Sequence, residues 1–328
     1  MRDRLIVSAS MAAAVTLAFA LDAVASGASP QESVPATAKV FRPVEAHQAL
    51  AAPPAPANLS YNGGPVLTAP SIFLIYWGPQ WSSGFSTGGY SSAQAQTYVD
   101  SFFGGVGAST WLNSTTQYCQ GIAAGQQFCS GLPGAQFVTN PAAQLAGTWI
   151  DTTAVPRSPS DSAVRAAAAR GATHFGYRST ALYMVLTPQG RSTPGFGTQW
   201  CAYHDNGTFS GQPLAYANIP YQPDAGASCG RNFVNTTNDT FGHGYFDGLS
   251  IVAGHEYAEV ITDAFPSSAL AWIDSQGAEN ADKCAWIQGP PGSQPAAQDV
   301  TLGSQSFAVQ SLWSNLANGG GGGCVISS

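Results

Sequence analysis

A histidine and two glutamates share one short run of the chain, GHEYAEVITDAF, as His255, Glu256 and Glu259. Residues four apart on an α-helix lie on the same face, so His255 and Glu259 can both point at one metal ion. Glu256 then projects beside them, where a carboxylate can take a proton from a metal-bound water. The spacing is that of the His-Glu-x-x-His zinc helix, with Glu259 in place of the second histidine.

A metal site with two ligands on one helix needs a third ligand from another segment. Glu279 lies in the run GAENADKC, twenty residues after Glu259, and is the best-placed carboxylate. Asp282, three residues further on, can orient a ligand. Asp263 is eight residues from His255, about 12 Å along a helix axis, and is too distant to bind the same ion. We therefore predict that Asp263 supports a ligand or caps the helix.

One neutral imidazole and two carboxylates would balance the charge of a divalent cation and make it a weaker Lewis acid than in a two-histidine site. The imidazole and the helix favour Zn²⁺, and the oxygen-rich ligand set also admits manganese or iron. In a hydrolytic reaction Glu256 would be the general base. The candidates for stabilising an oxyanion lie in glycine-rich segments that are predicted to be loops. They are Tyr203, His204, His243 and Tyr245.

The apolar pattern predicts the elements that position these residues. Residues 71–77 and 180–186 are continuous apolar runs, typical of strands buried on both faces. Helices are expected after the first run, over 91–105, and before the second run, from Asp161 onward. The broad apolar stripe of residues 248–265 places the histidine and glutamates on a helix. The fold class is predicted to be α/β (α+β), a mixed sheet with packed helices.

Shorter or irregular segments are expected elsewhere. Residues 190–246 are rich in Gly, Pro, Asn and aromatics and are predicted to be a long irregular region, with a short strand at 214–219. Short strands are also expected at 271–273 and 307–309, before a flexible glycine run at 319–323.

The start of the chain is typical of an exported protein. Residues 1–25 carry an arginine-bearing start, an apolar stretch and an Ala-x-Ala cleavage pattern, which together predict a secretory signal peptide. Residues 26–58 are rich in Ala and Pro and are predicted to be a propeptide or flexible leader, since they can bury little apolar surface. Residues 59–328 are expected to form a single domain, and no later stretch is apolar enough to span a membrane.

All six cysteines lie in the part predicted to be exported, where an even number favours disulfides. The alternative is a cysteine-ligated metal site, but the chain has no Cys-x-x-Cys pair. Local spacing suggests three bonds: Cys119 with Cys129, Cys201 with Cys229, and Cys284 with Cys324.

Charge excludes two classes of partner. Only 9% of residues are charged and the formal net charge is -7. Nucleic acids and anionic membranes are bound through basic patches, so neither is expected. The partner expected instead is a protein or peptide substrate, and no oligomeric state is predicted.

The motif helix followed by a glutamate resembles the zincin metallopeptidases whose third ligand is glutamate. More closely, the runs GHEYAEVITD, AWID, GAENADKCAW and VQSLWSN, with YNGGPVLTAPSIFLIYWG earlier, are similar to secreted bacterial proteins related to the plant EXORDIUM, or phosphate-induced, family. In that group the helix commonly reads His-Glu-x-x-Glu and is followed by Glu-x-x-Asp-x-Cys. The resemblance covers about the last eighty residues and the start of the predicted domain, and it implies the same site without fixing the reaction.

The sequence thus favours a secreted zinc endopeptidase. A non-catalytic alternative is a secreted cell-wall or carbohydrate-binding or signalling module with a structural metal, and a plain ion-pair cluster would need no metal at all. A serine hydrolase is a further alternative, because Gly84-Phe85-Ser86-Thr87-Gly88 matches Gly-x-Ser-x-Gly. A nucleophile elbow joins its strand directly to its helix, however, and extra residues intervene on both sides of Ser86.

Overall fold

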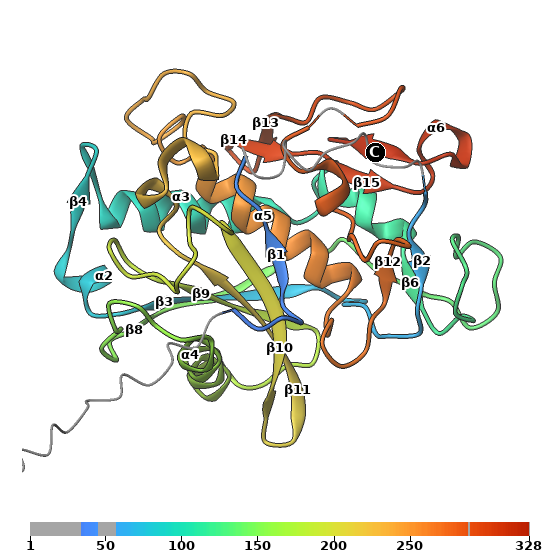
Figure 1. Cartoon of the computed structure of the whole chain (residues 1–328), viewed down its shortest axis with the longest axis horizontal. Helices are drawn as coiled ribbons and strands as arrows, with labels where there is room; N and C mark the ends of the chain where they lie inside the picture. Colours follow the sequence, from blue (N-terminus) through green and yellow to red (C-terminus); the bar gives the residue numbers. More distant parts are fainter. Residues whose placement is uncertain (1–33, 45–56, 288, 328) are drawn as a thin grey trace, which may run out of the picture. The chain divides into compact units, whose positions relative to one another are not determined.

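The computed structural model describes residues 34–44, 57–287 and 289–327 of the chain (Figure 1). The predicted signal peptide, residues 1–25, lies outside the described residues, as does most of the predicted leader, 26–58. In the described ranges the main sheet has six strands in the order β1-β10-β11-β9-β3-β8.

The centre of this sheet is parallel. Strands β3 (Ser71–Trp77) and β9 (Ala181–Leu186) lie side by side where the apolar runs predicted them. Strand β8 (Leu145–Asp151) pairs with the outer side of β3, and β11 (Gln212–Ile219) pairs with β9, both in parallel. The prediction of buried central strands is confirmed.

The other edge of the sheet is antiparallel. Strand β10 (Ala202–Phe209) pairs antiparallel with β11, and the short β1 (Lys39–Phe41) pairs antiparallel with β10. The sheet is therefore mixed, as predicted. The expectation of an irregular region over 190–246 is wrong in part, because this region contains the eight-residue strand β10. Within residues 26–58, predicted to be a propeptide or flexible leader, residues 39–41 form a strand and so are not flexible coil. Both strands depend on long-range pairing, which local composition does not reveal.

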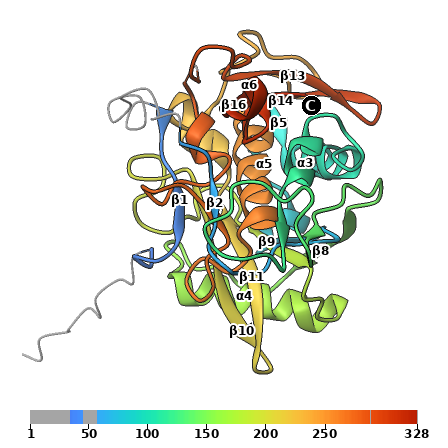
Figure 2. The ribbon, with the colours of Figure 1, turned by 90° about the vertical axis from the view of Figure 1, so that its right-hand side faces the viewer.

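Helices cover both faces of the sheet (Figures 1 and 2). Alternate residues of β3 point to opposite sides, and a separate apolar cluster lies on each. Helix α4 (Asp161–Phe175) packs into the cluster that contains Phe73 and Ile75. Helices α3 (Ser92–Gly105) and α5 (Asp247–Thr262) pack on the other face. This layering explains why β3 is apolar throughout rather than alternating.

The predicted serine cap is present at the start of α3. The Ser91 hydroxyl accepts a hydrogen bond from the Gln94 N–H, and the Gln94 side chain accepts one from the Ser91 N–H. This capping box satisfies two N–H groups at the start of the helix. Ser160 caps α4 in a similar way by accepting from the Ala163 N–H.

The C-terminal part adds small two-stranded sheets. Residues 319–323, predicted to be flexible, instead contribute to a short helical turn and a strand. The paired strands are β12 (Trp272–Ile273) with β2 (Ser60–Tyr61), β13 (Ala297–Leu302) with β14 (Gln305–Gln310), and β15 (Leu312–Ser314) with β16 (Gly323–Val325). The remaining short elements are α2 (Gln80–Ser83), β4 (Ser86–Thr87), β5 (Tyr90–Ser91), β6 (Cys119–Gln120), β7 (Gln136–Phe137) and α6 (Ala317–Gly320).

All six cysteines are paired as their spacing suggested, so the disulfide prediction is confirmed. The bonds are Cys119–Cys129, Cys201–Cys229 and Cys284–Cys324. Among the described residues, no helix has both the length and the apolar character needed to cross a bilayer. Both findings are compatible with an extracellular protein.

Candidate metal centre

Helix α5 carries three of the candidate side chains through the middle of the domain. Every residue of α5 is buried, and His255, Glu256 and Glu259 are at most 1% exposed. Close packing limits the neighbouring positions: a Cβ atom on Gly254 would lie 3.0 Å from the rings of Phe102 and Trp111. A helix surrounded in this way is mostly apolar on all sides, and its buried polar side chains need partners inside the protein.

The His255 ring has a defined orientation. Gln310 on β14 donates its amide hydrogens to the carbonyls of Ala281 and Ser311, at 2.9 and 3.1 Å, so its Oε1 is left as an acceptor. His255 Nδ1 lies 3.0 Å from that Oε1 and must be the donor. In the neutral ring Nε2 is then an unprotonated nitrogen. It faces Glu259 Oε1 at 3.0 Å, so a cation or a proton is needed between the two atoms.

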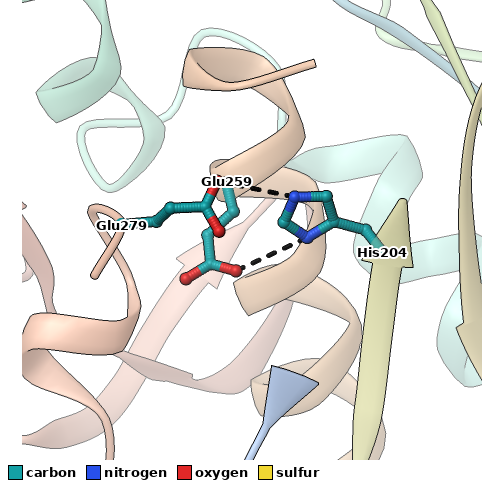
Figure 3. Close-up of side chains that lie close together, drawn as sticks. All are labelled: His204, Glu259 and Glu279. Carbon is teal, nitrogen blue, oxygen red and sulfur yellow. Dashed lines mark ion pairs between the residues drawn. The ribbon is translucent and has the colours of Figure 1, made fainter. Parts of the chain in front are cut away.

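His204 completes the cluster from the sheet (Figure 3). Its Nδ1 lies 3.0 Å from Glu256 Oε2 and 3.5 Å from Glu259 Oε2, and its Nε2 lies 3.5 Å from Glu279 Oε1. The sequence suggested His204 only as an oxyanion candidate in a loop. It is instead a fully buried residue of β10, within reach of three carboxylates.

Glu279 and Asp282 enter the site on the segment that follows β12. Glu279 is fully buried, and neither of its carboxylate oxygens has a hydrogen-bond partner. The backbone N–H of Asp282 donates to Glu259 Oε1 at 2.9 Å, which ties this segment to α5. Asp282 Oδ1 lies 3.8 Å from His255 Nε2, and its side chain is 25% exposed. Asp282 is therefore the most solvent-accessible member of the cluster.

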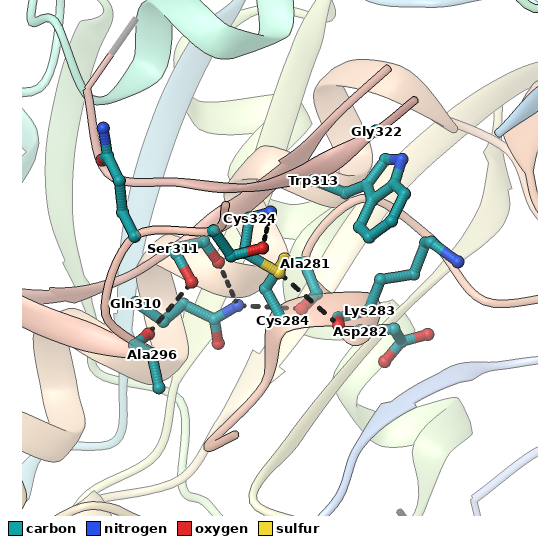
Figure 4. The surroundings of a disulfide bond; sticks show 12 residues. Ala281, Asp282, Lys283, Cys284, Ala296, Gln310, Ser311, Trp313, Gly322 and Cys324 are labelled. Carbon is teal, nitrogen blue, oxygen red and sulfur yellow. Dashed lines mark hydrogen bonds between the residues drawn. A yellow bond between two sulfur atoms is a disulfide. The ribbon is translucent and has the colours of Figure 1, made fainter. Parts of the chain in front are cut away.

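A buried ion pair and a disulfide hold that segment in place. Lys283 Nζ donates to Asp274 Oδ2 at 2.7 Å and lies 4.4 Å from the centre of the Trp313 ring. Asp274 Oδ1 also accepts the N–H groups of Gln276 and Ala278. The bond from Cys284 to Cys324 anchors the far end of the segment (Figure 4). The position of Glu279 thus depends on contacts on both sides of it.

Asp263 lies at the end of α5, where it caps the helix. Its N–H donates to the Glu259 carbonyl at 2.7 Å, and its Oδ1 accepts the Ala271 N–H at 2.8 Å. The carboxylate therefore joins the end of the helix to the strand region that precedes Glu279.

The buried carboxyl groups have raised pKa values, because burial disfavours their charged forms. Burial raises the pKa of Glu256 to about 7 and those of Asp263 and Glu279 to about 8, and it raises that of Glu259 as well. Burial alone would lower the pKa of Lys39, but the surrounding carboxylates outweigh it and raise that pKa. The cluster therefore contains more negative than positive charge when it is ionised.

Two sets of side chains in the described residues are spaced to hold a cation. His204, Glu259 and Glu279 form one set, and His255, Glu259 and Asp282 form the other, with ligand atoms within 4.8 Å of one another in each. The predicted set of His255, Glu259 and Glu279 is divided between them. The reason is that His204, from a distant strand, lies next to Glu279.

Tyr203 does not reach the site. Side chains alternate along a strand, so Tyr203 points to the opposite face of the sheet from His204. Its hydroxyl donates to Asp161 Oδ1 at 3.0 Å, in the cluster under α4. The suggestion that Tyr203 stabilises an oxyanion is wrong for this geometry.

Tyr245 and Ser86 also lie elsewhere. The Tyr245 ring stacks on Tyr90, and its hydroxyl lies 3.2 Å from the Thr87 hydroxyl in the hairpin of β4 and β5. Ser86 is exposed in the same hairpin and pairs with Ser91. This hairpin is not the direct strand-to-helix turn of a nucleophile elbow, so the structure gives no support to a serine nucleophile.

His243 is also outside the site, where it joins a loop to β14. Its Nδ1 lies 2.6 Å from Asp239 Oδ2, and its Nε2 lies 2.8 Å from the Ser306 carbonyl. Partial burial lowers the pKa of His243, but the hydrogen bonds with Asp239 and Ser306 raise it more, so the net shift is upward.

A pH dependence of stability follows from this contact. A histidine whose pKa is raised on folding stabilises the protein fully below its unfolded value of 6.5, and this contribution is lost as pH rises through the folded pKa. We expect His243→Gln to lower the free energy of unfolding more at about pH 5 than at about pH 9. Urea unfolding of both proteins at the two pH values measures this; an equal difference at both would contradict it.

Comparison with known proteins yields no relatives: no family model matches the chain, and no curated protein or solved structure matches it significantly. The likeness to glutamate zincins and to EXORDIUM-related proteins stays a prediction from motifs. The function must therefore be inferred from the geometry of the site.

Proposed function

We propose that this chain is a secreted metal-dependent hydrolase, a zinc endopeptidase whose centre is the cluster between α5, β10 and the segment after β12. The proposal depends chiefly on one observation. Two imidazole nitrogens, His204 Nε2 and His255 Nε2, are buried and have no hydrogen-bond partner. Each of them faces a carboxylate oxygen.

Such atoms are costly unless something satisfies them. A buried polar atom without a partner costs about 1–3 kcal/mol, and most buried polar atoms in folded proteins are paired. Among the described residues, the atoms of the cluster without a partner are His204 Nε2, His255 Nε2, Glu256 Oε1, Asp263 Oδ2, Glu279 Oε1 and Glu279 Oε2. A divalent cation would satisfy several of them at once and would offset the excess negative charge.

The donor set fits zinc. His204, Glu259 and Glu279 offer one nitrogen and two carboxylates, all at most 1% exposed, and His255 adjoins them through Glu259. Imidazole with carboxylate suits Zn²⁺ and also admits manganese or iron. A bound ion of this kind supplies Lewis-acid polarisation of a carbonyl and acidifies a coordinated water.

Glu256 is the residue that we assign as general base. His204 holds one of its oxygens at 3.0 Å, and the other oxygen, Oε1, has no partner and can accept a proton from water. His204 therefore has two roles, one toward Glu256 through Nδ1 and one toward the ion through Nε2. Glu279 and Glu259 complete the ligand set.

Metal content tests the proposal directly. We expect protein purified without chelator to contain at least one divalent ion per chain by elemental mass spectrometry. Glu259→Gln should lose the ion, since Glu259 belongs to both ligand sets. Asp100→Asn is the control, because Asp100 is a partly buried carboxyl on α3 that accepts from the Tyr76 hydroxyl away from the site. If no preparation contained stoichiometric metal, the hydrolase proposal would be wrong. The cluster would then be held together by protons shared between its side chains.

The burial of the site also supports a second candidate, a non-catalytic secreted binding or signalling module with a structural metal. His204, His255 and Glu256 have no exposed surface in this structure, as structural metal sites commonly have none. The two candidates differ over Glu256, which a structural site does not need.

A further inference from the structure

The short strand β1 lies beside β10 at the edge of the main sheet, near α5 (Figure 1). Strand β1 pairs with the start of β10, in a register that places Lys39 opposite His204 and Phe41 opposite Ala202. The Cys201 N–H donates to the Phe41 carbonyl at 2.7 Å. Without β1, strand β10 would be the edge of the sheet, and the edge of a sheet is a template for an extended peptide.

Phe41 covers a ring of the centre. It is fully buried, its ring stacks on His255 at 3.7 Å between centroids, and it lies 4.8 Å from the ring of Trp286. Trp286 also donates from Nε1 to the Arg42 carbonyl at 2.8 Å. Trp286 has a backbone φ of 59°, which is unusual for a bulky residue and is found where surrounding contacts enforce it.

Lys39 brings a positive charge to the same cluster. Residues two apart on a strand point to the same side, so Lys39 and Phe41 both face the centre. Lys39 Nζ donates to the Gly277 carbonyl at 2.8 Å, on the segment that carries Glu279. The carboxylates that do most to raise its pKa are Glu279, Asp263 and Asp282. A basic side chain and an aromatic one are thus held two positions apart.

An open pocket lies beside this segment. A pocket of about 690 Å³ lies between residues 34–42 and the segment 276–282, with Gln199 and Trp200 also in its wall. Asp282, the most exposed member of the cluster, lines the same pocket. The strand therefore lies in a groove that has room beside it.

We propose that β10, the segment 276–282 and Trp286 form a groove for an extended peptide, and that the chain's own residues 39–42 occupy it and close the centre. The preferred peptide has a basic residue followed two positions later by an aromatic one. Peptide binding in the groove does not depend on the proposed hydrolase activity. Inhibition of hydrolysis by residues 39–42 rests on that proposed activity.

Covalent linkage explains how only four residues, 39–42, can keep the groove filled. A tethered segment acts at an effective concentration in the millimolar range, which a free peptide does not reach. A cut in the chain between Phe41 and Leu59 would remove this advantage. The segment would then dissociate, and the edge of β10 would be free for another peptide.

A labelled synthetic peptide of residues 37–44, TAKVFRPV, tests the groove. We expect it to bind the full-chain double variant Lys39→Ala/Phe41→Ala at least about tenfold more tightly than it binds the unaltered protein, by fluorescence anisotropy. The same peptide with both residues changed to alanine should not bind. Equal binding to both proteins, or binding to neither, would overturn the proposal. Phe41→Leu, which keeps apolar volume without the ring stack, is a second variant if the double variant does not fold, and it should bind more tightly than the unaltered protein.

Hydrolysis tests the closing of the centre. The double variant is expected to degrade unfolded casein at least about tenfold faster than the unaltered chain. Phe137→Ala, an aromatic change at an exposed position of β7, should leave the rate unchanged. If the peptide bound but the protein had neither metal nor hydrolytic activity, the groove proposal would stand and the hydrolase proposal would be wrong. If both proteins contained metal and hydrolysed casein equally, but neither bound the peptide, the groove proposal would be wrong and the hydrolase proposal would stand.

Discussion

Changing Glu256 to glutamine is expected to lower the hydrolytic rate by about 10²–10⁴-fold, the usual contribution of a general base. The substitution keeps the shape and volume of the side chain but removes its ability to take a proton. Neither set of candidate ligands contains Glu256, so the metal content should stay the same. The rate should be measured on the Lys39→Ala/Phe41→Ala background, with casein as substrate and elemental analysis of the same samples.

Glu279→Gln is the matched control for this experiment. It makes the same chemical change in another buried glutamate, but Glu279 belongs to a ligand set, so this variant should lose metal as well as activity. If Glu256→Gln retained both metal and full activity, Glu256 would not be the base. If no variant were active while metal stayed bound, the structural-metal module would be the better assignment.

Asp274→Asn is expected to lower the free energy of unfolding by about 3–5 kcal/mol, the usual cost of breaking a buried ion pair from one side. The Lys283 ammonium would be left at 1% exposure without its carboxylate partner. Loss of the pair should also loosen the segment that carries Glu279, so metal affinity should fall as well. Urea unfolding and metal titration measure the two effects.

The double variant Asp274→Asn/Lys283→Met separates the ion pair from general damage to the segment. Removing both charges should recover most of the lost stability, because no unpaired charge remains. An equal loss in the single and double variants would show that packing, rather than charge, is responsible. Burial raises the pKa of Asp274, but the Lys283 contact and the N–H groups of Gln276 and Ala278 together lower it more, so the net shift is downward. This stabilisation is present above the unfolded value of 3.8 and is lost as pH falls through the folded pKa.

The elements that the sequence predicted well are those with strong local signals. Strand β3 is a continuous apolar run because apolar clusters cover both its faces, and α3 begins at a capping serine. Helix α5 follows from its apolar stripe, so the residues that decide these elements are near one another in the chain. The disulfides follow a simple order, because each joins two successive cysteines, 10, 28 and 40 residues apart.

Strand β10 was missed because its sequence, AYHDNGTF, is unlike a typical strand. Asp, Asn and Gly have low β-propensity, and the strand depends on its partners β11 and β1. His204 could therefore not be placed in the site from spacing alone, since Glu256 lies 52 residues away. One signal was available: buried charged groups need partners, and the chain has only five histidines.

The division of the candidate ligands into two sets also depends on tertiary packing. Helical spacing correctly indicated that His255 and Glu259 face one another, at 3.0 Å. It could not show that Gln310 orients His255, or that Asp282 rather than Glu279 lies on the His255 side. Those relations depend on how β14 and the segment 274–284 pack against α5, which no local pattern encodes.

The pairing of β1 also bears on how the protein behaves in concentrated solution. An exposed sheet edge presents unpaired N–H and C=O groups that can join the edge of another molecule, and short terminal strands and prolines limit this hazard. Strand β1 is only three residues long and is followed closely by Pro43. A form of the protein that has lost this strand would present a longer edge at β10, and would therefore gain access to peptides together with a greater tendency to self-associate.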